Sequence, residues 1–78
     1  MRVSRFLNGT YVIHSIRLDG ASWYSAWFDS DGKIIDAERR HGQRSFNIPN
    51  KHAKTWTRLQ AIGHRYKHVP KLLDANGV

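Results

Sequence analysis

Two Asp-Gly pairs in the first half of this chain limit its fold more than any other feature. They are Asp19-Gly20 and Asp31-Gly32, and they separate three runs rich in β-branched and aromatic residues, 10–18, 22–28 and 33–39. An Asp-Gly pair between apolar runs is a strong hairpin signal, because both residues tolerate the positive φ of a tight turn. The sequence therefore predicts a three-stranded antiparallel meander over about residues 10–40.

Alternation along the expected strands places aromatic residues on both faces of the sheet. In the first strand the more apolar set, which we expect to face the core, is Val12, His14, Ile16 and Leu18. In the second strand Trp23 and Trp27 share one face, opposite Tyr24 and Phe28. Aromatic strand residues usually pack against a helix. If the helix instead covers the other face, Trp23 and Trp27 are exposed and should bind something, as a base-stacking or self-association surface would.

A helix is expected over about residues 50–68, with Pro49 near its start and Asn47 or Asn50 as its cap. Its apolar stripe, at spacings of three and four, consists of Trp56, Leu59, Gly63 and Tyr66. The opposite face carries Lys51, Lys54, Arg58 and Arg65. Gly63 either ends a first helix or lets one helix approach the sheet closely. The stripe keeps its phase through Tyr66, which favours one continuous helix.

These elements predict a single α+β domain over residues 1–78, in which a three-stranded antiparallel β-meander packs against one C-terminal α-helix. Residues 41–47 are expected to connect sheet and helix, with a short fourth strand at 45–48 as the alternative, and 70–78 to form a tail. The 78 residues suffice for one domain and not for two. The chain has no cysteine and no run of ~20 apolar residues, so we expect a cytoplasmic protein without disulfides or a membrane span.

Charge is distributed very unevenly along the chain. The stretch from Arg39 to Lys71 holds nine Lys or Arg and no Asp or Glu, while five of the six acidic residues precede it, and the net charge is +7. Like charges held close together repel, so this concentration suggests a polyanionic partner, and nucleic acid is the commonest. The predicted nucleic-acid-binding residues are Arg39, Arg40, Arg44, Lys51, Lys54, Arg58, Arg65 and Lys67. The predicted stacking or protein-interface residues are Trp23, Trp27 and Tyr66.

The predicted function is that of a small nucleic-acid-binding protein, for duplex DNA rather than RNA, with an accessory or regulatory role of the kind mobile elements encode. The basic helix face and the loop from Arg39 to Arg44 would neutralise phosphates, and Arg44 and Arg58 are the candidates for reaching a groove, because a guanidinium pairs bidentately with guanine. A solvated helix face and an acidic protein partner are the alternatives for the basic residues. A second hypothesis is a phage-type inhibitory module that docks on a host protein or nucleoprotein complex through an exposed aromatic sheet face. A homodimer fits either function.

Other chemistry finds less support in the sequence. His64 and His68 have the spacing of two metal ligands on a helix, but only His41 or His52 offers a third ligand, so we expect no metal. Asp36, Glu38 and His41 suggest an acid-base set, but nothing positions a nucleophile or a Gly-rich phosphate loop. We therefore expect no enzyme and no cofactor.

The order of hairpin, hairpin and helix is carried by the segments 8–13, 17–20 and 44–48, followed by Ala53 and Trp56. It resembles the DNA-binding domains built from a three-stranded sheet and a helix, such as the arm-binding domain of phage-type tyrosine recombinases and the AP2-type domains. The resemblance covers about residues 8–60 and implies a sheet that docks in the major groove. This chain departs from that pattern by placing acidic residues on the sheet, which phosphates would repel: Asp29, Asp31, Asp36 and Glu38. We therefore expect the docking surface on the helix and the loop from Arg39 to Arg44, and carry over no base-reading residue.

Overall fold

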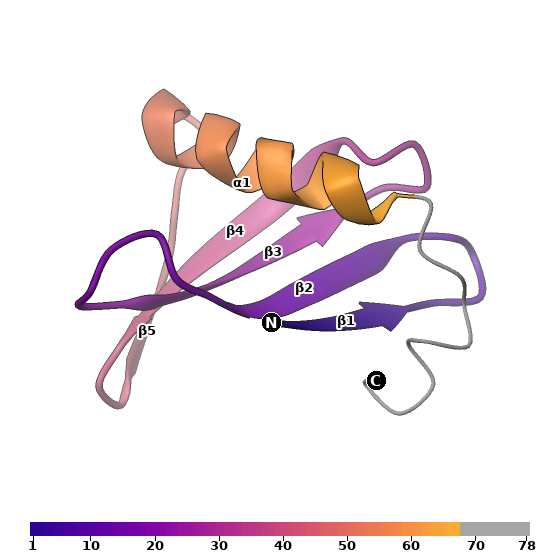
Figure 1. The fold of residues 1–78 in the computed structure, drawn as a ribbon. Coiled ribbons are helices and arrows are strands. Elements are labelled where there is room, and N and C mark those ends of the chain that lie inside the picture. Colours follow the sequence, from indigo (N-terminus) through magenta and orange to yellow (C-terminus); the bar gives the residue numbers. More distant parts are fainter. Residues whose placement is uncertain (68–78) are drawn as a thin grey trace.

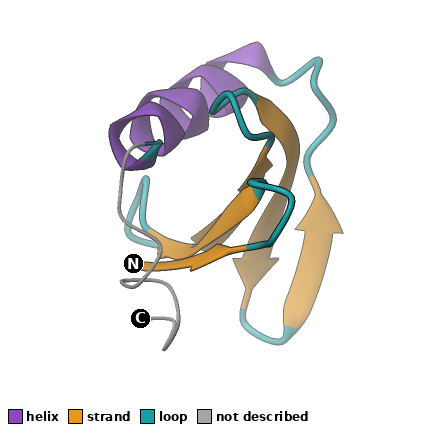
Figure 2. Cartoon of the chain, turned by 90° about the vertical axis from the view of Figure 1, so that its right-hand side faces the viewer, coloured by secondary structure: helices purple, strands orange, loops and turns teal. Residues whose placement is uncertain are grey.

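The computed structural model describes residues 1–67, which form one antiparallel sheet and one helix (Figure 1). The elements are β1 (Arg2–Arg5), β2 (Tyr11–Ile16), β3 (Trp23–Phe28), β4 (Ile34–His41), β5 (Arg44–Asn47) and α1 (Ala53–Tyr66). The five strands lie in the sheet in chain order, and α1 lies across one face (Figures 1 and 2). No helix within residues 1–67 covers the other face. Several sequence predictions fall outside the described residues. They concern the tail at 70–78, the end of the expected helix at 68, and the residues His68 and Lys71.

The α+β architecture with a meander and a C-terminal helix is confirmed, but the sheet has five strands, so the prediction of three is wrong. The first missed strand, β1, is joined to β2 by a turn at Asn8-Gly9. Gly9 has a φ of 91°, and the Phe6 N–H donates to the Thr10 carbonyl over 2.8 Å. Asn-Gly is itself a strong hairpin signal. β1 was missed because its four residues contain a single apolar side chain, Val3.

The second missed strand, β5, forms a hairpin with β4 where a connector was expected. Gly42 and Gln43 make the turn between the paired residues His41 and Arg44. Gly42 has a φ of 63°, as a two-residue turn with glycine at its first central position requires. The alternative of a short fourth strand near 45–48 was therefore the better one. The predicted loop from Arg39 to Arg44 is wrong, because Arg39 belongs to β4 and Arg44 to β5.

The two Asp-Gly turns are stabilised in different ways. At Asp31-Gly32 the expected positive φ is present, because Gly32 has a φ of 85°. At Asp19-Gly20 neither residue has a positive φ. There the Asp19 carboxylate accepts the Ala21 N–H at 2.8 Å and the Ser22 N–H at 3.1 Å. These two backbone hydrogen bonds lower the pKa of the Asp19 carboxyl below its ordinary value.

A β-bulge in β2 decides which side chains face the helix. Ser15 has a φ of 59°, and the pairing with β3 shifts between Ile13 and Ile16. Tyr11 and Ile13 precede the bulge on the helix side, and the extra residue brings Ile16 to the same side. The expectation that His14 would face the core is therefore wrong, whereas Ile16 and Leu18 pack on the core as expected. Val12 is buried, at 3% exposed, but on the opposite face of the sheet, where it is paired with Trp27.

The helix packs closely on the sheet at Gly63. Gly63 is buried and interior to α1, which confirms one continuous helix. A Cβ at this position would overlap the ring of Phe28, which is fully buried and stacks on Tyr11 with ring centroids 5.0 Å apart. The Tyr11 hydroxyl donates to the Gly63 carbonyl over 2.8 Å, and Leu59 is also fully buried. The predicted apolar stripe of the helix is therefore the face that packs on the sheet.

Side chains and carbonyls from other elements fix the ends of α1. The helix begins at Ala53, later than expected, and its N-cap residue is His52, which makes no side-chain capping bond. Capping by Asn47 or Asn50 is thus wrong. The Trp56 indole N–H donates to the Ile48 carbonyl at 2.9 Å, and Arg5 donates to the Tyr66 carbonyl at 2.8 Å. The last carbonyls of a helix have no partner within it, so Arg5 and Tyr11 satisfy two of them.

Candidate nucleic-acid interfaces

The structure divides the predicted basic residues between the two faces of the sheet. Arg39 is paired with Tyr24 and Phe46, so its side chain lies on the side that α1 covers. Arg40, the next residue of β4, points to the opposite face. Arg65 and Lys67 lie at the C-terminal end of α1, where a Cβ added at Gly32 would meet the methylene groups of Lys67. The eight predicted residues therefore do not form one surface.

Five of them belong to the β4–β5 hairpin and to the segment that leads from it into the N-terminal half of α1. We call this the helix-hairpin surface: Arg39, Arg44, Lys51, Lys54 and Arg58. All five side chains are exposed. Arg39 and Arg44 line one hollow, and the Arg44 guanidinium lies 5.7 Å from the centroid of the Phe46 ring. Arg58 donates to the Leu18 carbonyl over 2.9 Å, so one of its nitrogens is already occupied.

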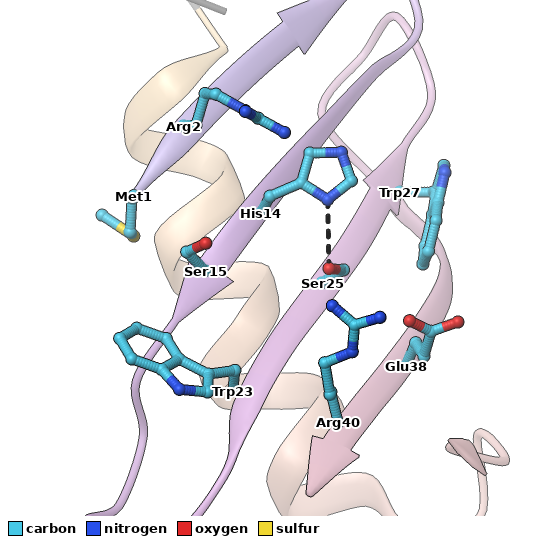
Figure 3. Close-up of a pocket in the computed structure, with 9 residues that line it drawn as sticks. All are labelled: Met1, Arg2, His14, Ser15, Trp23, Ser25, Trp27, Glu38 and Arg40. Atoms are coloured by element: carbon cyan, nitrogen blue, oxygen red, sulfur yellow. Dashed lines mark hydrogen bonds between the residues drawn. The ribbon is translucent and has the colours of Figure 1, made fainter. Parts of the chain in front are cut away.

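A second surface, which the sequence analysis only partly anticipated, covers the opposite face of the sheet. Figure 3 shows it with α1 passing behind the strands, so the labelled side chains project away from the helix. We call it the open sheet face. A shallow hollow of about 750 Å³ there is lined by Met1, Arg2, His14, Ser15, Trp23, Ser25, Trp27, Glu38 and Arg40. The sequence predicted that Trp23 and Trp27 would be uncovered if the helix packed on the other face of the sheet. The helix does pack there.

Contacts hold the two indoles of the open sheet face in place. The Arg17 guanidinium lies 4.2 Å from the centroid of the Trp23 ring and also donates to the Gly20 carbonyl over 2.9 Å. Trp27 lies edge-on to the His14 ring, with centroids 6.4 Å apart. His14 Nδ1 is 3.1 Å from the Ser25 hydroxyl (Figure 3). Trp23 remains 45% exposed, and Trp27 is half-buried.

The electrostatics of the open sheet face affect His14 most. Burial lowers the pKa of His14 below its ordinary value of 6.5, and the neighbouring Arg2 lowers it further, while Glu38 acts in the opposite direction. The imidazole is therefore neutral at pH 7.

Of the four acidic residues expected on the sheet, only two lie on this face. Asp36 is paired with Trp27 and Glu38 with Ser25. Asp29 and Asp31 sit in the β3–β4 turn, where the Asp29 carboxylate accepts backbone N–H groups of Asp31 and Lys33, both at 2.9 Å. Two carboxylates, those of Asp36 and Glu38, therefore lie on the face opposite the helix.

Several residues of the open sheet face were not predicted as site residues: Arg2, His14, Arg17 and Ser25. The Asn8-Gly9 turn was the signal that could have placed Arg2, because it pairs β1 with β2 and sets Arg2 opposite His14. Tyr66, the third predicted stacking or protein-interface residue, packs against the core on the helix side. It cannot act together with Trp23 and Trp27.

Within residues 1–67 no group of three or more side chains is placed to hold a metal ion, and His68 lies outside that range. The described part of the chain also contains no helix long and apolar enough to cross a membrane. Comparisons with protein-family models, curated proteins and solved structures found no match for this chain.

Proposed function

We propose that this protein binds nucleic acid, and duplex DNA in particular, through phosphate contacts from the helix-hairpin surface. One observation carries the proposal: five exposed cationic side chains follow one another along the chain from the β4–β5 hairpin into the N-terminal half of α1. The sequence from Arg39 to Lys67 offers them no Asp or Glu. Asp19 lines the hollow with Arg39 and Arg44 and offsets part of their charge. A phosphate backbone supplies the remaining negative charge, and neutralising it releases condensed counterions.

The helix start supports a bound polyanion. Lys54 is in the first turn of α1 and Lys51 lies just before it, and this turn contains no acidic residue. The N-terminus of a helix carries a partial positive charge, so each nearby cation costs about 0.3–1 kcal/mol of stability at low salt. A phosphate at this end reverses the sign of the interaction. The charge placement is thus unfavourable in the free protein and favourable in a complex.

Spacing supports contact with successive phosphates. Lys54 and Arg58 are four residues apart on one side of a helix of 14 residues, which is about 21 Å long, and Lys51 lies just before its first turn. The Arg44 guanidinium, exposed beside the hairpin turn, is the side chain best placed to reach guanine in a groove. Phosphate contacts fix position and orientation rather than sequence, which suits an accessory or regulatory role and needs no catalysis.

The test is fluorescence anisotropy of labelled mixed-sequence duplex DNA at about 50 and 200 mM salt. The triple variant K51Q/K54Q/R44Q should bind much more weakly. If all three residues contact phosphate, the slope of log K against log salt should become less steep by about 2.7, at 0.9 per phosphate. The single variants K54Q and K33Q are a matched pair, because Lys33 is exposed in the β3–β4 turn away from this surface. Failure of the wild type to bind at low salt, or unchanged binding by the triple variant, would refute the proposal.

A further inference from the structure

The open sheet face presents two tryptophans, Trp23 and Trp27. Within residues 1–67 no helix covers them. We propose that this face binds single-stranded nucleic acid, with Trp23 and Trp27 as two base-stacking positions. The inference rests on the proposed function in assuming a nucleic-acid ligand, but it assigns a different surface and a different strand form. Three arginines on this face, Arg2, Arg17 and Arg40, outnumber its two carboxylates, Asp36 and Glu38. That net positive charge favours nucleic acid over an apolar protein partner.

The first stacking position is Trp23. Its ring is almost half exposed, and the Arg17 guanidinium lies over it at 4.2 Å. Bases of single strands stack both on aromatic rings and on guanidinium planes, and neither kind of stacking requires a particular base. Arg17 also bonds the Gly20 carbonyl, which fixes the stack before a ligand arrives. A preordered stack loses less entropy on binding.

The second stacking position is Trp27, on the same face four residues further along β3. The two positions are about 13 Å apart, at 3.3–3.4 Å per residue. One base cannot cover both, so the face takes a strand rather than a mononucleotide. His14 and Ser25 lie between the indoles and offer hydrogen-bonding groups there (Figure 3).

Phosphate contacts come from Arg2 and Arg40. Arg40 is the cross-strand partner of Trp23, and Arg2 is the partner of His14, so both lie beside the stacking positions. Both side chains are exposed. In a duplex the bases stack on one another and cannot lie on the indoles, so this face should select single strands.

Glu38 indicates which bases the face prefers. A carboxylate only accepts hydrogen bonds, and Glu38 lies opposite Ser25, between the two indoles. It repels a phosphate but accepts from an exocyclic amino group such as the N4 amino group of cytosine. Thymine has a carbonyl oxygen at the corresponding position. The face should therefore bind oligo(dC) more tightly than oligo(dT).

The decisive experiment compares W23A with F46A in binding labelled oligo(dC) and oligo(dT) of about 16 nucleotides, enough for one site. Trp23 and Phe46 are equally exposed, at 45%, but lie on opposite faces of the sheet. W23A should weaken single-strand binding roughly 5- to 150-fold, because stacking is worth about 1–3 kcal/mol per base. F46A, which alters the ring beside Arg44 on the helix-hairpin surface, should lower single-strand affinity less than W23A does and keep the oligo(dC) over oligo(dT) preference. Wild-type affinity in W23A would overturn the inference.

A second pair of variants separates this inference from the proposed function. R39Q and R40Q remove the same charge from adjacent residues whose side chains point to opposite faces. R40Q should lower single-strand affinity more than duplex affinity, and R39Q should do the reverse. If the wild type bound neither duplex nor single-stranded nucleic acid, both proposals would be refuted. Nucleic-acid binding that R40Q and W23A leave unchanged would refute only this one, and a protein partner or a second copy of the chain would then be the occupant to test.

The base preference provides an independent check on Glu38. E38Q removes the negative charge but keeps a side chain of similar size, so the sheet should be undisturbed. The oligo(dC) over oligo(dT) preference should fall while overall single-strand affinity rises. Equal affinity of the wild type for both strands, or an unchanged preference in E38Q, would contradict the assigned role of Glu38.

Discussion

β3 carries six consecutive residues, and its two faces meet different environments. Tyr24, Ala26 and Phe28 face α1 and are at most 6% exposed. Trp23, Ser25 and Trp27 face away, and Trp23 is nearly half exposed. Hydrophobicity does not distinguish the two sets, because the larger aromatic residues lie on the uncovered face. The covered face packs against α1, whereas no helix of residues 1–67 covers the indoles of the open sheet face.

The difference between the faces can be tested first at Gly63, where the covered face is most tightly packed. In G63A the new methyl group would overlap the fully buried Phe28 ring. Alanine gains about 1 kcal/mol of helix propensity, but overpacking a core costs about 1–3 kcal/mol. Overpacking should win, because Tyr11 stacks on the ring and limits its movement. We expect a net loss of up to about 2 kcal/mol in the free energy of unfolding, measured by urea denaturation.

The double variant F28L/G63A sharpens that prediction. Leucine lacks the ring atoms that the new methyl group would meet, so G63A should cost less in the F28L background than in the wild type. A coupling energy of about 1 kcal/mol or more is expected for residues in contact. If G63A proved as stable as the wild type, the close approach of helix and sheet at Gly63 would be wrong.

A second test of the covered face removes one hydroxyl group. Y11F breaks the buried hydrogen bond to the Gly63 carbonyl and should cost about 1–2 kcal/mol, because the carbonyl loses its partner. Y24F is the matched control. Tyr24 is also buried, but its hydroxyl donates over 3.3 Å to the exposed Asp19 carboxylate, which water can solvate instead. Thermal or urea unfolding should show a larger loss for Y11F than for Y24F, and the reverse order would contradict this arrangement.

The local features of the fold could be predicted from the sequence, and the partition of side chains between faces could not. Asp31-Gly32, the helix stripe and the close approach at Gly63 depend on neighbouring residues, so local patterns identified them. The bulge at Ser15 depends on pairing with β3, and it reversed the faces assigned to Val12 and His14. This error hid the open sheet face and its link to Arg2.

The candidate site shows the same limit. Charge along the sequence correctly marked exposed basic residues, because Arg39, Arg40 and Arg44 are all exposed. It could not show that Arg39 and Arg40 point to opposite sides, because that requires knowing that β4 extends to His41. A loop was expected there, and alternation applies only to a strand. A single charged surface was therefore predicted where the protein has two.

A third test measures how pH affects the open sheet face. The pKa of His14 is lower in the folded protein than its unfolded value of 6.5, so the unfolded chain binds the proton more readily. The free energy of unfolding should therefore decrease as the pH falls below about 6.5. The decrease should be smaller than the loss caused by Y11F. H14Q should remove this part of the pH dependence, and H64Q, at an exposed histidine of α1, is the control for loss of an imidazole.

Ligand binding should change with pH in the opposite direction. A phosphate beside Arg2 favours the protonated imidazole of His14, so single-strand affinity should rise as the pH falls through the same range. Glu38 and Arg2 face His14 and set the size of the change. If affinity and stability fell together at low pH in the wild type, or if H14Q kept both trends, His14 would not be part of the surface.

The smallest expected effect is on the stability of W23A, and it completes the comparison between the two faces. Trp23 is nearly half exposed and lies outside the core cluster, so its truncation should change the free energy of unfolding by about 0.5 kcal/mol or less, against about 1–2 kcal/mol for Y11F. The same substitution should cost up to two orders of magnitude in single-strand affinity. Urea denaturation and anisotropy on one protein preparation measure both quantities. A large loss of stability in W23A would mean that the tryptophan supports the fold, and the contrast between a structural and a binding face would fail at the residue where it is sharpest.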